Sequence, residues 1–160
     1  MYKRQAEIRN EFDLLKSQLA TIGVKLVGEF GDVPTYLKAM DAGNFQLAFV
    51  AWYADYPDAE NFYQVLYSRN TAPGPNYGGF ANPAYDRGYE ASRGMANGPQ
   101  RFEIFRRLNA IVRDEVPAIV VRESLRVDSV QKWIGNYKRN LFTTELPFLS
   151  VDLAAKKKGL

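Results

Sequence analysis

The stretch FQLAFVAWYADYPDAENF, residues 45–62, decides the fold. Its first part, residues 45–52, is a nearly continuous apolar run of the length typical of a strand buried on both faces of a sheet. The run ends in a loop that carries Asp55, Asp58 and Glu60. Open α/β sheets bind ligands at the carboxyl ends of their strands, so this loop is the predicted functional site.

The residues before the apolar run predict helices and strands in alternation. Apolar residues recur every three or four positions over 4–22, which predicts an amphipathic helix that Gly23 ends. A short strand over 24–30 is expected next, followed by a helix that begins after the capping residue Asp32 and ends near Gly43. The order strand, helix, strand is typical of a βαβ unit with parallel strands. The sequence therefore predicts an α/β fold with βαβ units.

The chain after the acidic loop is expected to be mostly helical. A short aromatic helix over 61–67 precedes a long loop, 68–83, that is rich in Pro, Gly and Asn. Two helices follow, one over 83–93 and one from Asn97, which with Gln100 resembles a capping box. The second of these helices carries a clean apolar stripe, made of Ile104, Phe105, Leu108, Ile111 and Val112.

The last part of the chain has a weaker pattern. Val116 and Pro117 are expected to end the second helix, and residues 118–121 to form a short buried strand. Beyond residue 125 the apolar periodicity loosens into weak strands, among them 141–144 and 149–153. We expect this part to pack on a surface that the sequence itself does not contain.

Composition excludes several classes of site and partner. A chain of 160 residues fits one domain or a large piece of a bigger protein. It contains neither cysteine nor histidine, which excludes thiol nucleophiles, Ser–His–Asp triads, disulfides and zinc sites with His or Cys ligands. The formal charge is only +3 and no apolar run approaches the roughly 18 residues of a membrane span, so neither nucleic-acid binding nor membrane insertion is expected. No cofactor and no metal site is predicted.

Four stretches, taken in order, resemble a known family. They are LLKSQLATIGVKL at 14–26, GNFQLAFVAWYADYPDAENF at 43–62, NYGGFANPAYDRG at 76–88 and QRFEIFRRLNAIVRDEVPAIVV at 100–121. In order and spacing they are similar to the peptide-type extracellular solute-binding proteins of ABC transporters, which bind dipeptides, oligopeptides or nickel complexes. The most specific pieces are a Trp-x-x-Asp-x-x-Asp loop and an Asn-Pro-x-x-Asp turn, formed by Trp52, Asp55 and Asp58 and by Asn82, Pro83 and Asp86.

The resemblance implies a protein of two lobes, much longer than this chain, that works in the periplasm or outside the cell in association with the membrane. Residues 1–125 would be most of the distal ligand-binding lobe, a periplasmic-binding-protein-like lobe truncated at its N-terminus. Residues 126–160 would return toward the first lobe and end in a tail. The implied partners are a peptide or another small amine-bearing solute and a membrane permease, and the implied role is not catalytic.

The resemblance also implies which residues hold the ligand. Ala51, Trp52 and Tyr53 would lie along the peptide backbone, and Asp55 would receive the terminal ammonium of the ligand. The chemistry agrees, because main-chain groups at a strand end can pair with an extended peptide and a carboxylate forms a charge-assisted hydrogen bond with an ammonium. Tyr77, in the long loop, is a further candidate.

Each of these residues also has a structural explanation. Trp52 could cap the core at the end of the strand, and Asp55 could form a turn or cap a helix. Asp58 is expected to cap the helix at 60–67. Tyr77 could simply belong to a surface loop.

Two other classes of function compete with the solute-binding protein. Asp55, Asp58 and Glu60 could provide a carboxylate pair for glycoside hydrolysis, but nothing else in the sequence supports a sugar site. Alternatively, a stand-alone protein-interaction domain could bind its partner through the aromatic and acidic loop 52–62. The order of the four stretches favours the solute-binding protein.

Overall fold

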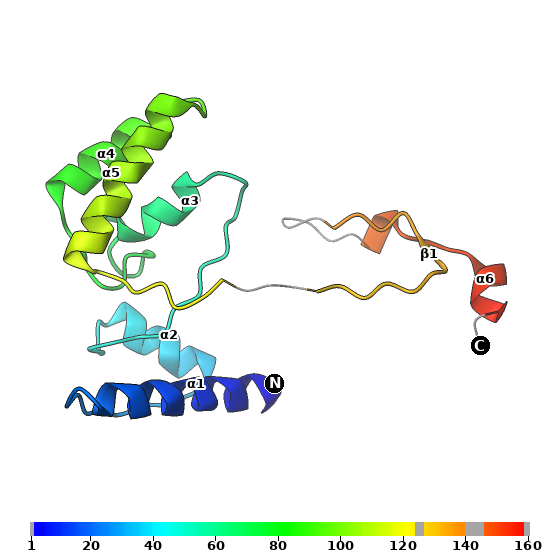
Figure 1. The fold of residues 1–160 in the computed structure, drawn as a ribbon, viewed down its shortest axis with the longest axis horizontal. Helices are drawn as coiled ribbons and strands as arrows, with labels where there is room; N and C mark the ends of the chain where they lie inside the picture. Colours follow the sequence, from blue (N-terminus) through cyan, green and yellow to red (C-terminus); the bar gives the residue numbers. More distant parts are fainter. Residues whose placement is uncertain (1, 124–126, 140–145, 159–160) are drawn as a thin grey trace. The chain divides into compact units, whose positions relative to one another are not determined.

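The computed structural model describes residues 2–123, 127–139 and 146–158 (Figure 1). The chain divides into two compact units, Met1–Gln46 and Leu47–Leu160. Helices make up most of the regular structure in the described ranges, where the sequence predicted a sheet with helices around it.

Helix α1, Tyr2–Ala20, ends where a glycine permits a left-handed turn. Gly23 has φ of +80°, and its N–H donates to the carbonyl of Ala20 at 3.1 Å. The next N–H, that of Val24, donates to the carbonyl of Leu19 at 3.0 Å. These two bonds form a Schellman motif, which satisfies the last carbonyls of a helix. The predicted helix and its stop are confirmed.

Helix α2, Val33–Asp41, has the predicted cap. The side chain of Asp32 accepts a hydrogen bond from the N–H of Thr35 at 2.9 Å. Hydrogen bonding by Thr35 also holds the pKa of the Asp32 carboxyl below its usual range. The helix is followed by Gly43 at φ of +67°, which makes the same kind of terminal turn as Gly23.

Neither strand of the predicted βαβ unit is formed within the described residues. Residues 24–30 and 45–52 have no strand hydrogen bonding. Phe30 instead packs edge-on against Phe12 of α1, with ring centroids 5.2 Å apart, and Leu47 is 61% exposed. An extended segment becomes a strand only when a neighbouring segment bonds to its backbone. The apolar run alone could therefore not specify a sheet.

The predicted short helix at 61–67 is present as two shorter elements. Helix α3 spans Glu60–Tyr63, and a 3-10 turn, η1, continues it over Gln64–Leu66. A second 3-10 turn, η2, spans Ser68–Asn70 and opens the long loop.

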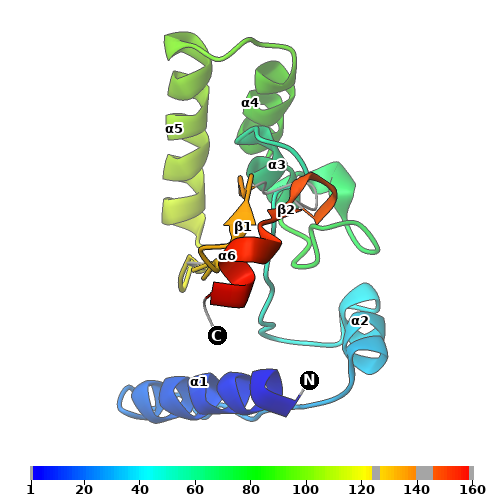
Figure 2. The ribbon, with the colours of Figure 1, turned by 90° about the vertical axis from the view of Figure 1, so that its right-hand side faces the viewer.

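The core of the second unit lies among α3, α4 and α5. Helix α4 spans Pro83–Arg93 and α5 spans Pro99–Glu115, and the two lie side by side as a helical hairpin (Figures 1 and 2). The buried residues of this core are mostly aromatic: Tyr67, Tyr85, Tyr89, Phe105 and Leu108. The predicted apolar stripe of α5 is confirmed, because it supplies two of these residues and, packed against them, Ile104, Ile111 and Val112.

The Asn-Pro-x-x-Asp turn closes the long loop on this core. Asn82 Oδ1 accepts from two N–H groups in the first turn of α4, at 2.8 and 2.9 Å, and so caps that helix. Asp86, within α4, accepts from the backbone N–H and the hydroxyl of Ser68 at 3.1 and 2.5 Å. The turn thus joins the two ends of the loop 68–83.

Helix α5 begins without the predicted capping box. In the described structure its N-cap is Gly98 and no side chain caps it. Asn97 Oδ1 accepts instead from Arg101 Nη1 at 2.7 Å, because the buried guanidinium, 3% exposed, needs acceptors for its N–H groups. The helix does end where expected: Val116, with φ of +48°, leaves it just before Pro117.

The prediction of a buried strand at 118–121 is wrong. This segment has no strand hydrogen bonding, and its valines and isoleucine are 71–85% exposed. Apolar residues are buried only where another element covers them, and the described part of the second unit leaves these side chains open.

The chain beyond residue 127 contains one small antiparallel pair among its described residues. Strand β1, Ile134–Gly135, pairs with β2, Ser150–Val151, which lies inside the weak strand predicted at 149–153. A 3-10 turn, η3, spans Leu146–Phe148, and helix α6 spans Leu153–Lys158. The weak strand predicted at 141–144 lies outside the described residues.

Candidate functional site

One buried side chain, that of Asn61, organises the loop that the sequence singled out. Asn61 is 0% exposed and lies in α3. Its Oδ1 accepts from Trp52 Nε1 at 2.8 Å and from the backbone N–H of Asp55 at 3.3 Å. Its Nδ2 donates to Asp55 Oδ2 at 3.4 Å. A single amide therefore brings together two of the residues that the sequence assigned to the ligand.

The predicted ligand residues differ in exposure. Trp52 is half-buried, with its indole N–H turned to Asn61, whereas Ala51, Tyr53 and Asp55 are exposed. Asp55 Oδ1 has no partner among the residues that the structure describes. A carboxylate can accept about four hydrogen bonds, so Asp55 retains the capacity to accept from an ammonium.

Asp58 bonds to the first N–H of α3, although it is not the N-cap that the sequence predicted. Although the formal N-cap of α3 is Ala59, Asp58 Oδ1 accepts from the N–H of Glu60 at 2.9 Å. Asp58 Oδ2 accepts from Arg101 Nη1 at 2.8 Å. The Arg101 guanidinium, and then the N–H of Glu60, hold the pKa of the Asp58 carboxyl below its usual range. Asp58 therefore supports the loop and its oxygens are engaged.

Glu60 is buried, at 8% exposure, and its carboxylate is also engaged. It accepts hydrogen bonds from the hydroxyls of Tyr56 and Tyr89, and one oxygen lies 3.9 Å from Arg93 Nε. Burial, and then the bond to Glu60, raise the pKa of the Tyr89 phenol; the bond to Glu60 is the main cause of the raised pKa of Tyr56. Among the three acids of the loop, Asp55 is thus the one whose carboxylate stays available.

Tyr77 lies on a separate segment that is built around another buried amide. Asn76 is 1% exposed, and its Nδ2 donates to the carbonyls of Tyr67 and Phe80 at 3.1 and 2.8 Å. Its Oδ1 accepts from the N–H of Phe80 at 3.1 Å. Tyr77 is half-buried beside it. The described bonds that join Trp52 to the acidic loop do not include Tyr77, so these bonds do not bring Tyr77 to the other predicted ligand residues.

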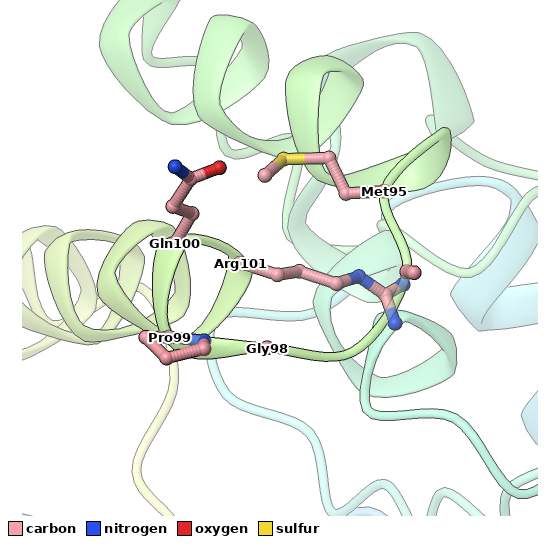
Figure 3. A pocket seen from close by; sticks show the side chains of 6 residues that line it. Met95, Gly98, Pro99, Gln100 and Arg101 are labelled. Carbon is pink, nitrogen blue, oxygen red and sulfur yellow. The ribbon is translucent and has the colours of Figure 1, made fainter.

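An open hollow of about 470 Å³ lies at the start of α5 (Figure 3). Figure 3 shows the side chains of Met95 and Gln100 extending toward each other, while Arg101 reaches toward the loop before α5. The guanidinium of Arg101 is already bonded to Ser92 and Asp58. The hollow therefore presents no free charge and is a weaker candidate than the loop; it is lined by Met95, Ala96, Gly98, Pro99, Gln100 and Arg101.

The described residues hold no cluster of three or more His, Cys, Asp or Glu side chains that could bind a metal ion. Nor do they include a helix with the length and apolar character needed to span a membrane.

Sequence reasoning missed Asn61 and Arg101. Arg101 could have been found, because it lies four residues before Phe105 and seven before Leu108 and so falls on the buried face of α5. Asn61 carried a weaker signal. Its position after Asp58 indicates a helix start, but nothing in the sequence shows that its amide turns back to Trp52.

The comparison with protein families agrees with the resemblance found in the sequence. Residues 2–74 match the description "Bacterial extracellular solute-binding proteins, family 5 Middle". The matched range includes the whole loop that carries Trp52 and Asp55, and it includes Asn61.

Individual relatives are similar over most of this chain but over a minor part of their own length. The chain is 23% identical over 134 residues to the di/tripeptide-binding protein 3 of Pseudomonas aeruginosa, covering 82% of this chain and 25% of the relative. It is 23% identical over 133 residues to the dipeptide-binding protein of Escherichia coli, covering 81% and 24%. It is 24% identical over 140 residues to the heme-binding protein A of Haemophilus influenzae, covering 88% and 24%.

The chain thus spans about a quarter of the length of the relatives that it matches. These relatives are named for what they bind, and two of the three for short peptides. The resemblance stated from the sequence is confirmed: residues 2–74 match the model of the bacterial extracellular solute-binding proteins of family 5, and the chain is similar to peptide-binding proteins over about a quarter of their length.

Proposed function

We propose that this chain is part of the ligand-binding component of an ABC importer, which captures peptides or similar amine-bearing solutes in a cleft between two lobes. The captured solute would be delivered to a membrane permease, with closure of the lobes reporting occupancy. The observation that carries this proposal is the family match over residues 2–74, which contains the loop of Trp52, Asp55 and Asn61. The names of two relatives, which bind dipeptides or tripeptides, support the class of ligand.

In the complete protein, residues 24–30 and 45–52 would pair as the parallel strands of a βαβ unit. The lack of strand hydrogen bonding in these two described segments, and exposed apolar side chains such as Leu47 at 61%, support this pairing. Residues 1–125 would form most of the distal lobe, and residues 126–160 would return toward the first lobe.

The ligand would lie against the segment that Asn61 holds in place. Ala51 and Tyr53 are exposed residues whose backbone could pair with an extended peptide, and Trp52 would border it. The open carboxylate of Asp55 would receive the terminal ammonium. Tyr77 would approach the ligand from its own loop.

The same proposal gives the protein a non-catalytic role in the periplasm or outside the cell, associated with the membrane through the permease. The family description, which calls its members extracellular, supports this location. The engaged carboxylates of Asp58 and Glu60 support the absence of a hydrolytic carboxylate pair.

The test is a calorimetric titration of the protein that carries this segment together with its first lobe. The ligands are a short peptide and its N-acetylated twin, and the variants are Asp55→Asn and, as a control, the exposed Asp41→Asn. An enclosed charge pair costs about 3–5 kcal/mol when one partner is removed, so acetylation and Asp55→Asn should each weaken binding more than about 100-fold. Equal affinity for both peptides would overturn the role of Asp55.

A further inference from the structure

The orientation of the Asn61 amide is fixed by chemistry. The indole N–H of Trp52 can only donate, so the amide atom that faces it at 2.8 Å must be the oxygen. The backbone N–H of Asp55, also a donor, lies against the same oxygen at 3.3 Å. The nitrogen of the amide is therefore the atom that faces Asp55 Oδ2. Two donors thus fix the orientation of the Asn61 amide, and the Asp55 carboxylate accepts from Nδ2 in that orientation.

Asn61 holds both the backbone and the carboxylate of Asp55. The bond to the backbone N–H places the residue, and the bond from Nδ2 to Oδ2 selects one side of its carboxylate. At 3.4 Å the second bond is longer than the usual 2.9–3.0 Å. The Asp55 carboxylate thus has a defined orientation and can still accept further hydrogen bonds. Its Oδ1 is left for another donor.

The residues behind Asn61 are held by hydrogen bonds to the helical core. Its neighbour Glu60 is bonded to the hydroxyls of Tyr56 and Tyr89, and Tyr89 is 3% exposed. The start of α3 is held by Asp58, which is in turn held at 2.8 Å by the buried Arg101 of α5. Through its bonds to Asp55, Asn61 therefore fixes the exposed carboxylate of that residue relative to the helical core.

We propose that Asn61 is the positioning residue of the ligand site: it aims the Asp55 carboxylate at the ligand's amino group and so sets the preference for a free amino terminus. This inference rests on the proposed function. It differs from a purely structural role for Asn61, which would affect free and blocked peptides alike.

The experiment measures the ratio of affinities for a free peptide and its N-acetylated twin, in the protein with both lobes. In Asn61→Leu the ratio should fall at least about tenfold, because the free peptide loses a well-placed charged partner while the blocked peptide keeps the backbone contacts. Asn61→Ser, whose side chain is too short to reach Asp55, should give the same fall. It takes the place of Asn61→Leu if that variant fails to fold. The control is Asn70→Leu, which removes a half-buried amide bonded at 3.0 Å to the carbonyl of Gln64.

A fourth variant, Asp55→Asn, distinguishes a failure of the positioning role of Asn61 from a failure of the proposed ligand site. If Asp55→Asn abolishes the preference and Asn61→Leu retains it, Asn61 is not a positioning residue, although the proposed site survives. If Asp55→Asn keeps the preference for the free peptide, the ligand role of Asp55 and the positioning role of Asn61 are both overturned. If the proposal holds, Asn61→Leu added to Asp55→Asn should not change the ratio further, because the two residues act through one interaction.

Discussion

At the scale of single residues, Arg101 holds three segments together. Its Nε donates to the carbonyl of Ser92 at 2.9 Å, and its Nη1 donates to Asp58 at 2.8 Å and to Asn97 at 2.7 Å. The substitution Arg101→Met keeps the aliphatic stem but removes all of these donors. We expect a loss of about 3 kcal/mol in the free energy of unfolding, at the low end for a broken buried pair because the Asp58 side chain is 30% exposed. The free energy of unfolding of the variant and of the unmodified protein is measured by urea denaturation.

The matched control is Arg106→Met on the outer face of the same helix. Arg106 pairs with Glu103 at 3.0 Å, but its side chain is 72% exposed. An exposed pair of this kind contributes about 0.2–1 kcal/mol. Equal losses for the two variants would contradict the role given to Arg101.

The same pair makes stability depend on pH. Arg101 holds the pKa of the Asp58 carboxyl below its usual range, so the unfolded chain takes up this proton at a higher pH than the folded chain. The stabilisation is therefore complete at neutral pH and is lost as the pH falls from about 4 through the lower folded value. In Arg101→Met the decline of stability in this acidic range should be shallower. A decline of stability as steep as that of the unmodified protein would contradict this role of the Arg101–Asp58 pair.

The residues of the site also show what the sequence could predict. The bond between Asp58 and the start of α3 was predictable because its partner, the N–H of Glu60, is two residues away. The bond from Trp52 to Asn61 spans nine residues and depends on how the loop turns back on α3. Local hydrogen bonding can be read from a sequence, whereas this return of the chain cannot.

At the scale of elements, the packing of α4 on α5 depends on a glycine. A Cβ added at Gly88 would lie 2.7 Å from Leu108 Cδ2 in the core. Overpacking costs about 1–3 kcal/mol, and the better helix propensity of alanine returns about 1 kcal/mol. We expect Gly88→Ala to lower the free energy of unfolding by about 1 kcal/mol, measured by thermal or urea denaturation followed by circular dichroism.

Gly94 provides the comparison for Gly88. It follows α4 with φ of −91°, and a Cβ there would meet nothing within 4 Å. Gly94→Ala should therefore be neutral or slightly stabilising. A loss at Gly94 equal to the loss at Gly88 would show that close packing on Leu108 is not the cause.

The elements differ in how far the sequence specifies them. Helices α1, α2, α4 and α5 were predicted because their apolar spacing and their Pro and Gly boundaries are contained in each segment, although the capping box predicted for α5 does not form. The runs 45–52 and 118–121 were predicted as strands from apolar character alone, and neither pairs in the described structure. A strand is defined by its neighbour, and the sequence of one segment does not contain that information.

At the scale of the whole chain, large apolar side chains stay exposed within the second unit. Leu47, Val50, Ile119 and Val120 are between 53 and 85% exposed. Exposed apolar surface of this kind favours association. We expect residues 1–160 on their own to self-associate in sedimentation velocity experiments, and Val120→Lys to reduce the association. A single monomeric boundary at high concentration would contradict this expectation.

The core of the second unit also has a consequence for the order of folding. All residues that are buried in the described part of this unit lie between Glu60 and Leu108. Contacts between residues close in sequence form fast, because only short stretches of chain have to be closed. As the chain leaves the ribosome, this region can complete its core while later residues are still being synthesised. The segment of Trp52 and Asp55 would then be anchored, through Asn61, before the residues that follow this core have left the ribosome.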